Sequence, residues 1–417
     1  MNFFRILILI INFVSISYML YYVIIGIFAF KKSHNYIEKK EYKKFAIIIP
    51  ARNESIVIGD LIQSLNSQNY PKEMYDIYVV PNNCDDNTEE IAKSYNSKII
   101  DCSKIITNSK GDVLRYAFKY LRAYDYNAYL IFDADNIVHP NFIKEMNNKL
   151  IEGYRIAQGY RDSKNPKDTW ISSSHSLHYI IQNYFMNRAR NNIDKSCFVN
   201  GTGFMISKEY IEENGYNALT ITEDIELNVN CGLNNEQIAF VENAITYDEQ
   251  PTTFEVSWKQ RKRWSVGTLQ CLKAYWNRII MDIFKNKNFG SVESIMFLTA
   301  PLIQLVGTFN IVLQVIVDFL MYRKINYVSK AILLILYYIS NIILIIGIVK
   351  INQKHVRNYI KGIILLPVFY LSWVPINIVA LFEKKSTWER IEHIRTVNLE
   401  SILKFNYISK SGVKYEE

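Results

Sequence analysis

The sequence has few cysteines, and none of them belongs to a CxxC pair. The five residues lie far apart in a chain of 417: Cys84, Cys102, Cys197, Cys231 and Cys271. An odd, scattered set of this kind predicts neither a disulfide framework nor a zinc site. We therefore expect a reducing, cytosolic environment for the part of the chain that carries them.

The amino terminus lacks the marks of a cleaved signal peptide, which has an apolar region of only about 7 to 15 residues and a small-residue cleavage site. Residues 3–30 carry one charge, Arg5, and this mostly apolar run exceeds the roughly 20 residues that cross a bilayer. We expect a membrane-spanning helix over 1–30. Basic residues follow it, so the positive-inside rule predicts an outer amino terminus and a cytosolic domain. They are Lys31, Lys32, Lys39, Lys40, Lys43 and Lys44.

Three further apolar runs of spanning or near-spanning length lie within 291–382. They are Ser291–Tyr322, Ala331–Val349 and Gly362–Phe382. If all three runs cross the membrane, the tail, 383–417, lies outside. Its basic residues instead favour the inside. The sequence therefore leaves open whether the number of crossings is odd or even, and so the side of the tail. Those basic residues are Lys384, Lys385, Arg390 and Arg395. The first run also contains polar residues that fit interhelical hydrogen bonds or the lining of a conduit equally well: Gln304, Asn310, Gln314 and Asp318.

The middle of the chain alternates short β-branched runs with amphipathic segments. The runs "FAIIIP" at 45–50, "DIYVVPNN" at 76–83 and "AYLIFD" at 128–133 have the pattern of strands. Helical spacing follows each of the first two strands, at 55–68 and 87–95, and recurs at 113–124. Strands that alternate with helices predict an α/β fold with a mostly parallel, Rossmann-like sheet, whose ligands bind beyond the carboxyl ends of the strands.

Polar residues gather at the ends of those strands, in Arg52–Glu54, Asn82–Asp86 and Asp133–Asp135. In the last of these, "DAD", one carboxylate can meet a ligand and the other a hard cation such as Mg²⁺ or Mn²⁺. Locally, a turn or helix cap explains this motif more often. Glu223 and Asp224 of "TED" likewise fit the first turn of a helix. The order of strand-end acids, DAD, TED and then QRKRW favours a binding site.

The stretch "SWKQRKRWSVG" at 257–267 places four cationic side chains and two tryptophans ahead of the apolar end of the chain. The residues that follow, "LKAYWNRIIMDIF", have the pattern of an amphipathic helix at a membrane surface, which we expect over 268–290. This context excludes a nucleic acid as the partner. We assign Arg261 and Lys262 to lipid headgroups or solvent. A basic-aromatic cluster that only anchors the chain to the membrane is the simpler alternative.

Seven segments of the chain, taken in order, resemble the membrane-integrated family 2 glycosyltransferases, the inverting group that contains cellulose, chitin, hyaluronan and poly-N-acetylglucosamine synthases. The segments are "VVPNNCDDNTEEIA", "KGDVLRYAF", "IFDADNIVHPNF", "NGTGFMIS", "TEDIELN", "YDEQPTTF" and "QRKRW". The resemblance extends from about Phe45 to Gly267 and implies a GT-A fold that binds a nucleotide sugar, usually a UDP-sugar, with Mg²⁺ or Mn²⁺. We accordingly expect a cytosolic GT-A domain over 31–267 and an α-helical transmembrane bundle over 291–382.

The resemblance also implies roles for individual residues. Glu54 and Asp86 would hold the nucleoside, Lys110 the nucleotide, and Asp133 and Asp135 the nucleotide and the metal. Asp224 would be the general base, with Glu223 as a further substrate-binding residue. The family's QxxRW pattern falls on Gln260, Arg263 and Trp264, for which we expect the donor diphosphate at Arg263 and the acceptor sugar at Trp264. One departure is Asn82, where the family usually has an Asp, so a charge near the nucleoside is absent.

These implications predict a multi-pass enzyme of the cell membrane, with a cytosolic catalytic domain, that extends a polysaccharide from a nucleotide-sugar donor. Membrane lipids and accessory subunits are further partners that we expect. Single transfer to a lipid acceptor is the alternative, because the ceramide glucosyltransferase group carries a similar QxxRW motif. A catalytically silent membrane subunit or sugar-nucleotide sensor is a third interpretation. The joint presence of both DAD acids, Asp224 and Arg263 argues against it.

Overall fold

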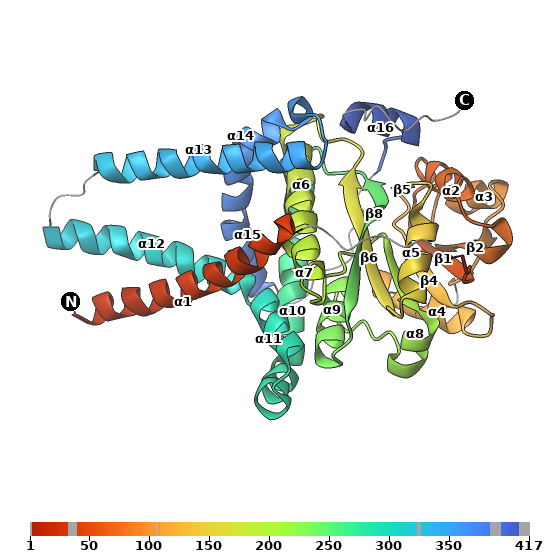
Figure 1. The fold of residues 1–417 in the computed structure, drawn as a ribbon, viewed down its shortest axis with the longest axis horizontal. Helices are drawn as coiled ribbons and strands as arrows, with labels where there is room; N and C mark the ends of the chain where they lie inside the picture. The colour runs from red at the N-terminus through yellow and green to blue at the C-terminus, as the bar shows by residue number, and fades with distance from the viewer. Residues whose placement is uncertain are drawn as a thin grey trace.

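The computed structural model describes residues 2–31, 40–103, 105–107, 109–322, 327–383 and 393–407. Some residues named above lie outside this part of the chain: Lys32, Lys39, Lys384, Lys385, Arg390 and the side chain of Asp318. Figure 1 shows an α/β domain beside a group of long helices, with the carboxyl-terminal helix returning to the α/β side. Both parts expected from the sequence, an α/β domain and a set of apolar helices, are therefore present.

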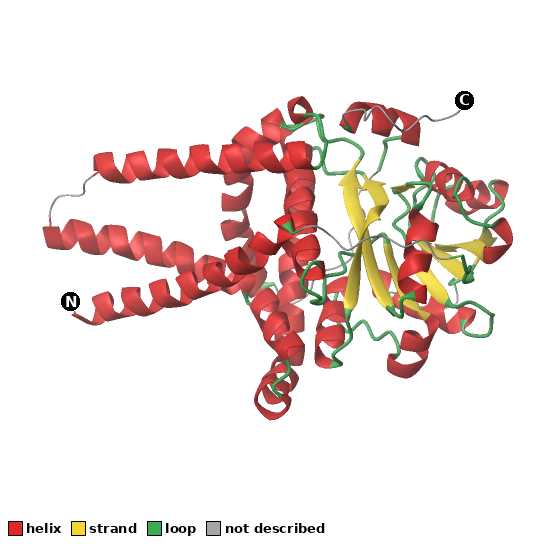
Figure 2. Ribbon diagram, viewed as in Figure 1, coloured by secondary structure: helices red, strands yellow, loops and turns green. Residues whose placement is uncertain are grey.

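The strands form one mixed sheet in the order β3-β2-β1-β4-β7-β6-β8-β5 (Figure 2). Parallel pairs join β1 to β2 and β4, β2 to β3, and β6 to β8. Strand β7 runs antiparallel to β4 and β6, and β5 to β8. The strands are β1 (Phe45–Ala51), β2 (Tyr75–Pro81), β3 (Lys98–Ile99), β4 (Ala128–Ile131), β5 (Ile137–Val138), β6 (Ile156–Ser163), β7 (Phe204–Ser207) and β8 (Ile238–Asp248).

Helices cover both faces of this sheet, and this explains the unbroken apolar run of β1. Ile47 and Ile49 pack in the core beneath α2, whereas Ala46 and Ile48 pack in the core beneath α4. A strand buried on both faces needs apolar residues at every position. The helices of this domain are α2 (Ile58–Asn66), α3 (Thr88–Ser94), α4 (Lys110–Leu121), α5 (Phe142–Ile151), α6 (Trp170–Ile181), η3 (Gln182–Arg188), α7 (Ala189–Asn191), α8 (Lys208–Asn214) and α9 (Glu223–Leu233).

The helix predicted over 268–290 is the second half of a longer helix, α10 (Phe254–Asn286), which also carries the basic stretch. The boundary that we placed after Gly267 therefore falls inside a helix. The helix continues through Gly267. Glycine allows close packing here, since a Cβ at this position would overlap with Thr222. Close packing against the loop before α9 thus favours glycine in the middle of α10.

The apolar run Ser291–Tyr322 is two helices, α11 (Phe289–Leu298) and α12 (Ala300–Tyr322), where we predicted one. The break falls just before Pro301, which has no N–H for the Phe297 carbonyl. Buried Glu293 fastens α11 to the α/β side of the molecule. Its carboxylate lies 3.2 Å from Arg190 and accepts a 2.6 Å hydrogen bond from Tyr21. Only the second helix is therefore available to cross a bilayer.

Four segments within the described residues are long and apolar enough to cross a membrane: Phe3–Phe30, Ala300–Val317, Ala331–Ile351 and Ile360–Phe382. The first comprises α1 (Asn2–Ile27) and η1 (Phe28–Phe30), and the third lies in α13 (Tyr327–Ile351). The fourth is broken into α14 (Ile360–Leu371) and α15 (Trp373–Phe382). In Figure 1, α1, α12 and α13 extend to the left, whereas α14 and α15 run beside α6 and α10.

Polar side chains in α12 bond to neighbouring helices. Asn310 and Gln314 donate to the Asn12 side chain of α1 at 2.8 and 3.2 Å. Gln304 donates to the Tyr370 carbonyl at 3.3 Å and accepts from Asn377 at 2.8 Å. Of the two alternatives left open by the sequence, these contacts favour interhelical hydrogen bonds over the lining of a conduit.

Candidate active site

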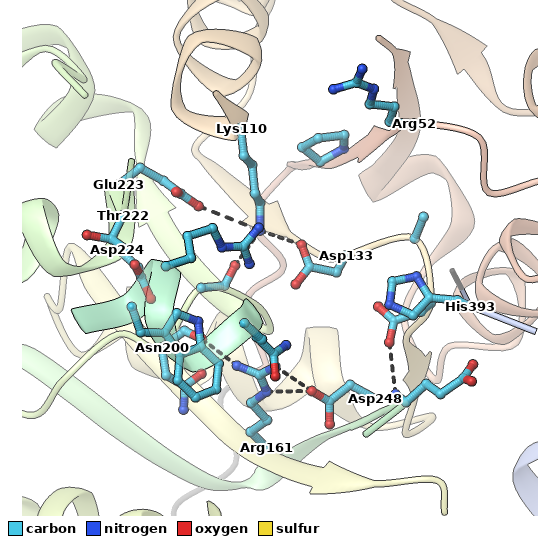
Figure 3. A pocket seen from close by; sticks show the side chains of 18 of the residues that line it. Arg52, Lys110, Asp133, Arg161, Asn200, Thr222, Glu223, Asp224, Asp248 and His393 are labelled. Atoms are coloured by element: carbon cyan, nitrogen blue, oxygen red, sulfur yellow. Dashed lines mark hydrogen bonds and ion pairs between the residues drawn. The ribbon is translucent and has the colours of Figure 1, made fainter. Parts of the chain in front are cut away.

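A pocket lies at the edge of the sheet where β1 and β4 end (Figure 3). The loops after these strands, the first turns of α4 and α9, the end of β8 and one face of α10 line it. Nine residues singled out from the sequence meet there: Glu54, Lys110, Asp133, Asp135, Glu223, Asp224, Gln260, Arg263 and Trp264. The expectation of a site beyond the carboxyl ends of the strands is thus matched by the geometry.

Lys110 forms the cationic centre of the pocket. Ser109 caps α4 by accepting a 3.2 Å hydrogen bond from the Asp112 amide, so the helix begins at Lys110. The ammonium lies between the carboxylates of Asp133 and Glu223 (Figure 3). It is ion-paired with Asp133, lies 3.7 Å from Glu223 and donates to the Gly201 carbonyl at 2.7 Å. Burial disfavours the charged form, but the two carboxylates outweigh it and raise the pKa of Lys110. Burial also raises the pKa of Glu223, to about 7.

Asp135 lies deeper in the pocket than Asp133. One of its carboxylate oxygens accepts a 2.8 Å hydrogen bond from the Glu249 amide, and the other accepts a long one of 3.4 Å from Asn136. Burial alone would raise the pKa of Asp135, yet the surrounding positive charges, His393 first among them, hold it below its usual value. Asp133 remains more accessible, with 35% of its side chain exposed. The two acids therefore offer carboxylate oxygens at two depths.

Asp224 occupies the first turn of α9, where a backbone glycine makes room for it. Its Oδ1 accepts a 2.9 Å hydrogen bond from the Ile225 amide. Gly201 has a φ of 89°, and a Cβ there would lie only 3.2 Å from Asp224 Oδ2. Burial raises the pKa of Asp224. A carboxylate that faces the pocket with a raised pKa is suited to accept a proton.

The basic stretch contributes one face of α10 to the pocket. Gln260, Arg263 and Trp264 stand at helical spacing on that face. Trp264 stacks on Trp373 of α15 with ring centroids 6.2 Å apart and an angle of 25°. Within the described part of the chain, the Arg263 guanidinium has no hydrogen-bond or ion-pair partner, in contrast to Arg161 and Arg261. Arg263 is thus a pocket guanidinium that is available to an anion.

The prediction that Arg261 and Lys262 face headgroups or solvent is wrong. Arg261 is fully buried and donates to the Phe369 carbonyl at 3.1 Å. Lys262 is half-buried and lies 3.1 Å from the Glu383 carboxylate. Both side chains point from α10 toward α14 and α15, because that side of the helix packs on another helix and not on the bilayer surface.

Asn82 and Asp86 do not line the pocket. Asn82 is buried at the end of β2, where its side-chain oxygen accepts a 2.5 Å hydrogen bond from Thr107. Asp86 accepts from the amides of Ser55 and Thr88, both at 3.1 Å. These contacts brace the loops that follow β1 and β2. A nucleoside-binding role for either residue stays a prediction.

Arg161 and Asp248 belong to the pocket and were not singled out from the sequence. They come from the parallel neighbours β6 and β8, and Arg161 lies 2.7 and 2.5 Å from Asp248 Oδ2 through two nitrogens. Arg161 also donates to the Asn200 carbonyl at 2.7 Å. Burial raises the pKa of Asp248 to about 6, and Arg161 limits the rise. Asp248 stands in the "YDEQPTTF" segment, but no local motif marks Arg161, whose partner lies 87 residues away.

The carboxyl-terminal tail reaches the pocket through His393. This side chain lies 3.0 Å from Glu54, and the next residues bond to Glu249 through the Arg395 amide at 3.0 Å. Burial opposes the charged imidazole, but Asp135 and Glu54 outweigh it and raise the pKa of His393 to about 10. No local pattern signals this contact, since Glu54 and His393 are 339 residues apart.

The fold and the pocket together define a GT-A glycosyltransferase. The mannosyltransferase PcManGT from Pyrobaculum calidifontis, solved in complex with GDP-Man and Mn²⁺, has this fold: it superposes with a TM-score of 0.61 at 12% identity, covering 92% of this chain and 100% of that one. The family model described as "Glycosyltransferase like family 2" matches residues 43–267. The chain belongs to this glycosyltransferase family, as its resemblance indicated.

Curated relatives from several bacteria share this domain. The probable glycosyltransferase YdaM of Bacillus subtilis is 26% identical over 59% of this chain and 62% of its own length. A beta-monoglucosyldiacylglycerol synthase of Trichormus variabilis is 24% identical over 57% and 51%. The poly-beta-1,6-N-acetyl-D-glucosamine synthase of Staphylococcus epidermidis is 22% identical over 81% of both chains. The chain thus matches half to three-fifths of the length of the first two relatives and four-fifths of the third.

Proposed function

We propose that this enzyme transfers a sugar from a nucleotide sugar, with a UDP-sugar as the first candidate, to a growing polysaccharide with inversion at the anomeric carbon. The observation that carries the proposal is one pocket that unites the acids Asp133 and Asp135, the carboxylate of Asp224 and the guanidinium of Arg263, which is unpaired among the described residues. A donor diphosphate needs cations and metal ligands, and an acceptor hydroxyl needs a base.

The reaction breaks the bond between the anomeric carbon and the diphosphate as the acceptor oxygen forms its own bond to that carbon. Asp224 takes the proton that the acceptor hydroxyl loses. The leaving diphosphate gains negative charge, which Arg263 is suited to stabilise through two parallel hydrogen bonds. A single base without a second catalytic carboxylate agrees with one-step inversion.

The acids of the DAD motif fit a hard cation. Both Asp133 and Asp135 present carboxylate oxygens, the ligands that Mg²⁺ and Mn²⁺ prefer. Among the described residues, no three His, Cys, Asp or Glu side chains converge in a metal-binding arrangement, so phosphate oxygens of the donor would complete the coordination shell. A bound ion would neutralise diphosphate charge as a Lewis acid.

The acceptor is the finer part of the proposal. A growing polysaccharide is supported by Trp264, whose ring offers an apolar face for a sugar on the pocket wall, and by the match to the Staphylococcus epidermidis synthase over most of both chains. A lipid acceptor is the second candidate. The match to the beta-monoglucosyldiacylglycerol synthase of Trichormus variabilis over 57% of this chain favours it.

We further propose three membrane crossings, by α1, α12 and α13, with the catalytic domain and the tail both in the cytosol. Lys354, just after α13, is buried against Asp162 of β6, and His393, after α15, contacts Glu54. Both ends of Ile360–Phe382 therefore lie on the catalytic side, which a single crossing would not allow. The two half-helices have 12 and 10 residues, about 18 and 15 Å, against a hydrocarbon core of roughly 30 Å.

The exposed side of α14 agrees with a position at the membrane surface. Four side chains that repeat at helical spacing are 49% to 65% exposed: Ile360, Ile364, Val368 and Leu371. Ile363, Leu366 and Phe369 are buried on the other side. An interfacial helix of this kind rests one apolar face on the lipid. In this arrangement the basic tail would lie inside, on the side that the positive-inside rule favours.

Cysteine labelling in intact cells tests this topology on a background without the native cysteines. Cysteines at Ser94 of α3 and Glu400 of α16 (Leu399–Asn406), both exposed positions, should resist an impermeant thiol reagent, and a cysteine at Phe3 should react. Labelling at Glu400 but not at Ser94 would show that Ile360–Phe382 crosses the membrane as a fourth span. Labelling at Ser94 would reverse the whole orientation.

The donor is tested with the purified enzyme in nanodiscs and a panel of UDP- and GDP-sugars, each with Mg²⁺ or Mn²⁺. We expect one nucleotide class to support release of nucleoside diphosphate in the presence of an acceptor extract. Release that is independent of every added donor, or equal with the Asp224→Asn variant, would contradict the proposed function.

A further inference from the structure

Arg261 lies between two pocket residues of α10 but faces the opposite way. Gln260 and Arg263 line the pocket, whereas Arg261 is 0% exposed and lies beneath α14 and α15. Ser265, one turn further along, points to the same side and donates to Asn377 of α15 at 2.7 Å. The two sides of α10 therefore have different partners, one the reaction pocket and the other the broken apolar segment.

The guanidinium of Arg261 binds at the break between α14 and α15. Its Nη1 donates to the Phe369 carbonyl at 3.1 Å and to Ser372 Oγ at 2.6 Å, and Ser372 Oγ donates in turn to the Phe369 carbonyl at 2.6 Å. Pro375 explains the break, because it has no N–H for the Leu371 carbonyl and its ring excludes that carbonyl from the helix. The last turn of α14 thus presents carbonyls that need donors.

The charge of Arg261 is balanced without a carboxylate among the described residues. The carboxyl-terminal end of a helix carries partial negative charge, and Arg261 lies at that end of α14. Its guanidinium also lies 4.4 Å from the ring centre of Phe369 and 5.6 Å from that of Trp373. Burial lowers the pKa of Arg261 to about 10, so the side chain stays protonated at neutral pH.

A buried cation of this kind is costly, and an apolar side chain would pack between two helices at lower cost. Unlike an apolar side chain, the guanidinium makes hydrogen bonds of defined direction. Its hydrogen bonds fix the rotation of α10 against the break, and a rotation of α10 would move every side chain on its pocket face. Trp373, the first residue after the break, also stacks on Trp264, so the break touches α10 both behind the pocket and at its wall.

We propose that Arg261 is a positioning residue, which holds α10 against the break between α14 and α15 so that Arg263 and Trp264 are presented to the donor and the acceptor. This inference rests on the proposed role of Arg263 at the donor diphosphate. It assigns the interfacial segment α14–α15 a function in the reaction, namely to set the geometry of the pocket from behind.

The first test compares Arg261→Met and Arg261→Lys with the matched control Lys262→Met. The control removes a neighbouring charge, but its side chain only meets the half-buried Glu383. We expect kcat/KM for the donor to fall by roughly 10²-fold in Arg261→Met, the scale of a displacement of about 1 Å, with partial recovery in Arg261→Lys and wild-type values in the control. If Arg261→Met has wild-type kinetics per folded molecule, the proposal is overturned, even when a smaller fraction of the variant folds.

A double-mutant cycle shows whether Arg261 acts through Arg263. If it does, Arg261→Lys should lower turnover by less than about twofold in an Arg263→Lys background, although it lowers turnover more in the wild type. Independent, additive losses would contradict the inference. An Arg263→Lys variant with wild-type kinetics would instead contradict the proposed function, and the two failures are thereby distinguished.

A labelling rate gives a readout that does not depend on Arg263. Gln260→Cys, on a background without native cysteines, places a thiol on the pocket face of α10. We expect Arg261→Met to change the rate of its reaction with a small thiol reagent at least threefold, and Lys262→Met to leave that rate unchanged. Equal rates in all three backgrounds would show that Arg261 does not set the rotation of α10.

Discussion

The two walls of the pocket are built in different ways. The sheet wall carries Glu54, Asp133 and Asp135 on loops that follow parallel strands, and most of its charges are already paired. The helix wall carries Arg263 and Trp264 on α10, with stacked aromatic rings and a guanidinium that no described residue pairs with. In the proposed function, the sheet wall would hold a metal and the nucleotide, and the helix wall the diphosphate and the acceptor.

The largest effect should follow from damage to the sheet wall. Because Asp135 is proposed as a metal ligand, EDTA should abolish transfer, and Asp135→Asn should remove metal-dependent nucleotide binding. Binding is measured by calorimetry with UDP, with and without Mn²⁺. The control is Asp125→Asn, an exposed position outside the pocket. Full activity of the Asp135→Asn variant in the presence of EDTA would contradict the proposed metal site.

A second effect should fall on Asp224, between the two walls. Asp224→Asn keeps the shape of the side chain but loses the base, so turnover should fall by at least about 10²-fold while donor affinity changes little. Glu223→Gln, one residue away beside Lys110, is the matched control and should cost less. A variant that binds donor poorly yet turns over normally at saturation would make Asp224 a binding residue.

Smaller effects should distinguish the functions within the helix wall. Arg263→Lys keeps a charge but loses the bidentate geometry, and we expect roughly a tenfold loss in the chemical step. Trp264→Ala should shorten the product while UDP binding stays near the wild-type value. Trp276→Ala, an exposed tryptophan further along α10, is the control for tryptophan loss. If the Arg263→Lys and Trp264→Ala variants lose the same step, the two residues do not have separate roles at the donor and the acceptor.

The sheet wall could be predicted from the sequence because its signals are local. A β-branched run followed by acids marks the end of a parallel strand, as at Ile131 and Asp133, and β4 does end at Ile131. The confirmed elements α2, α3 and α4 follow from the same periodicity. The GT-A domain is thus the part of the fold that short-range patterns specify.

The helix wall and the tail depend on contacts that no local pattern records. Arg261 reads as a membrane-surface residue from its neighbours, but its partners lie more than 100 residues further along the chain, in Phe369 and Ser372. Hydropathy likewise predicts a spanning helix over Gly362–Phe382 and cannot show that both flanks return to the same domain. His393 meets Glu54 only because α16 docks on the sheet, with Ile402 against Ile137 and Tyr247.

The size of the product tests the central claim most directly. Wild-type enzyme in nanodiscs, with its labelled donor, a divalent metal and a membrane extract, should give a ladder of products that lengthens with time, and Asp224→Asn should give none. A product that carries one sugar, with no ladder after extended incubation, would contradict the polysaccharide proposal and favour a lipid acceptor. No labelled product with any nucleotide sugar would contradict transfer by this pocket altogether.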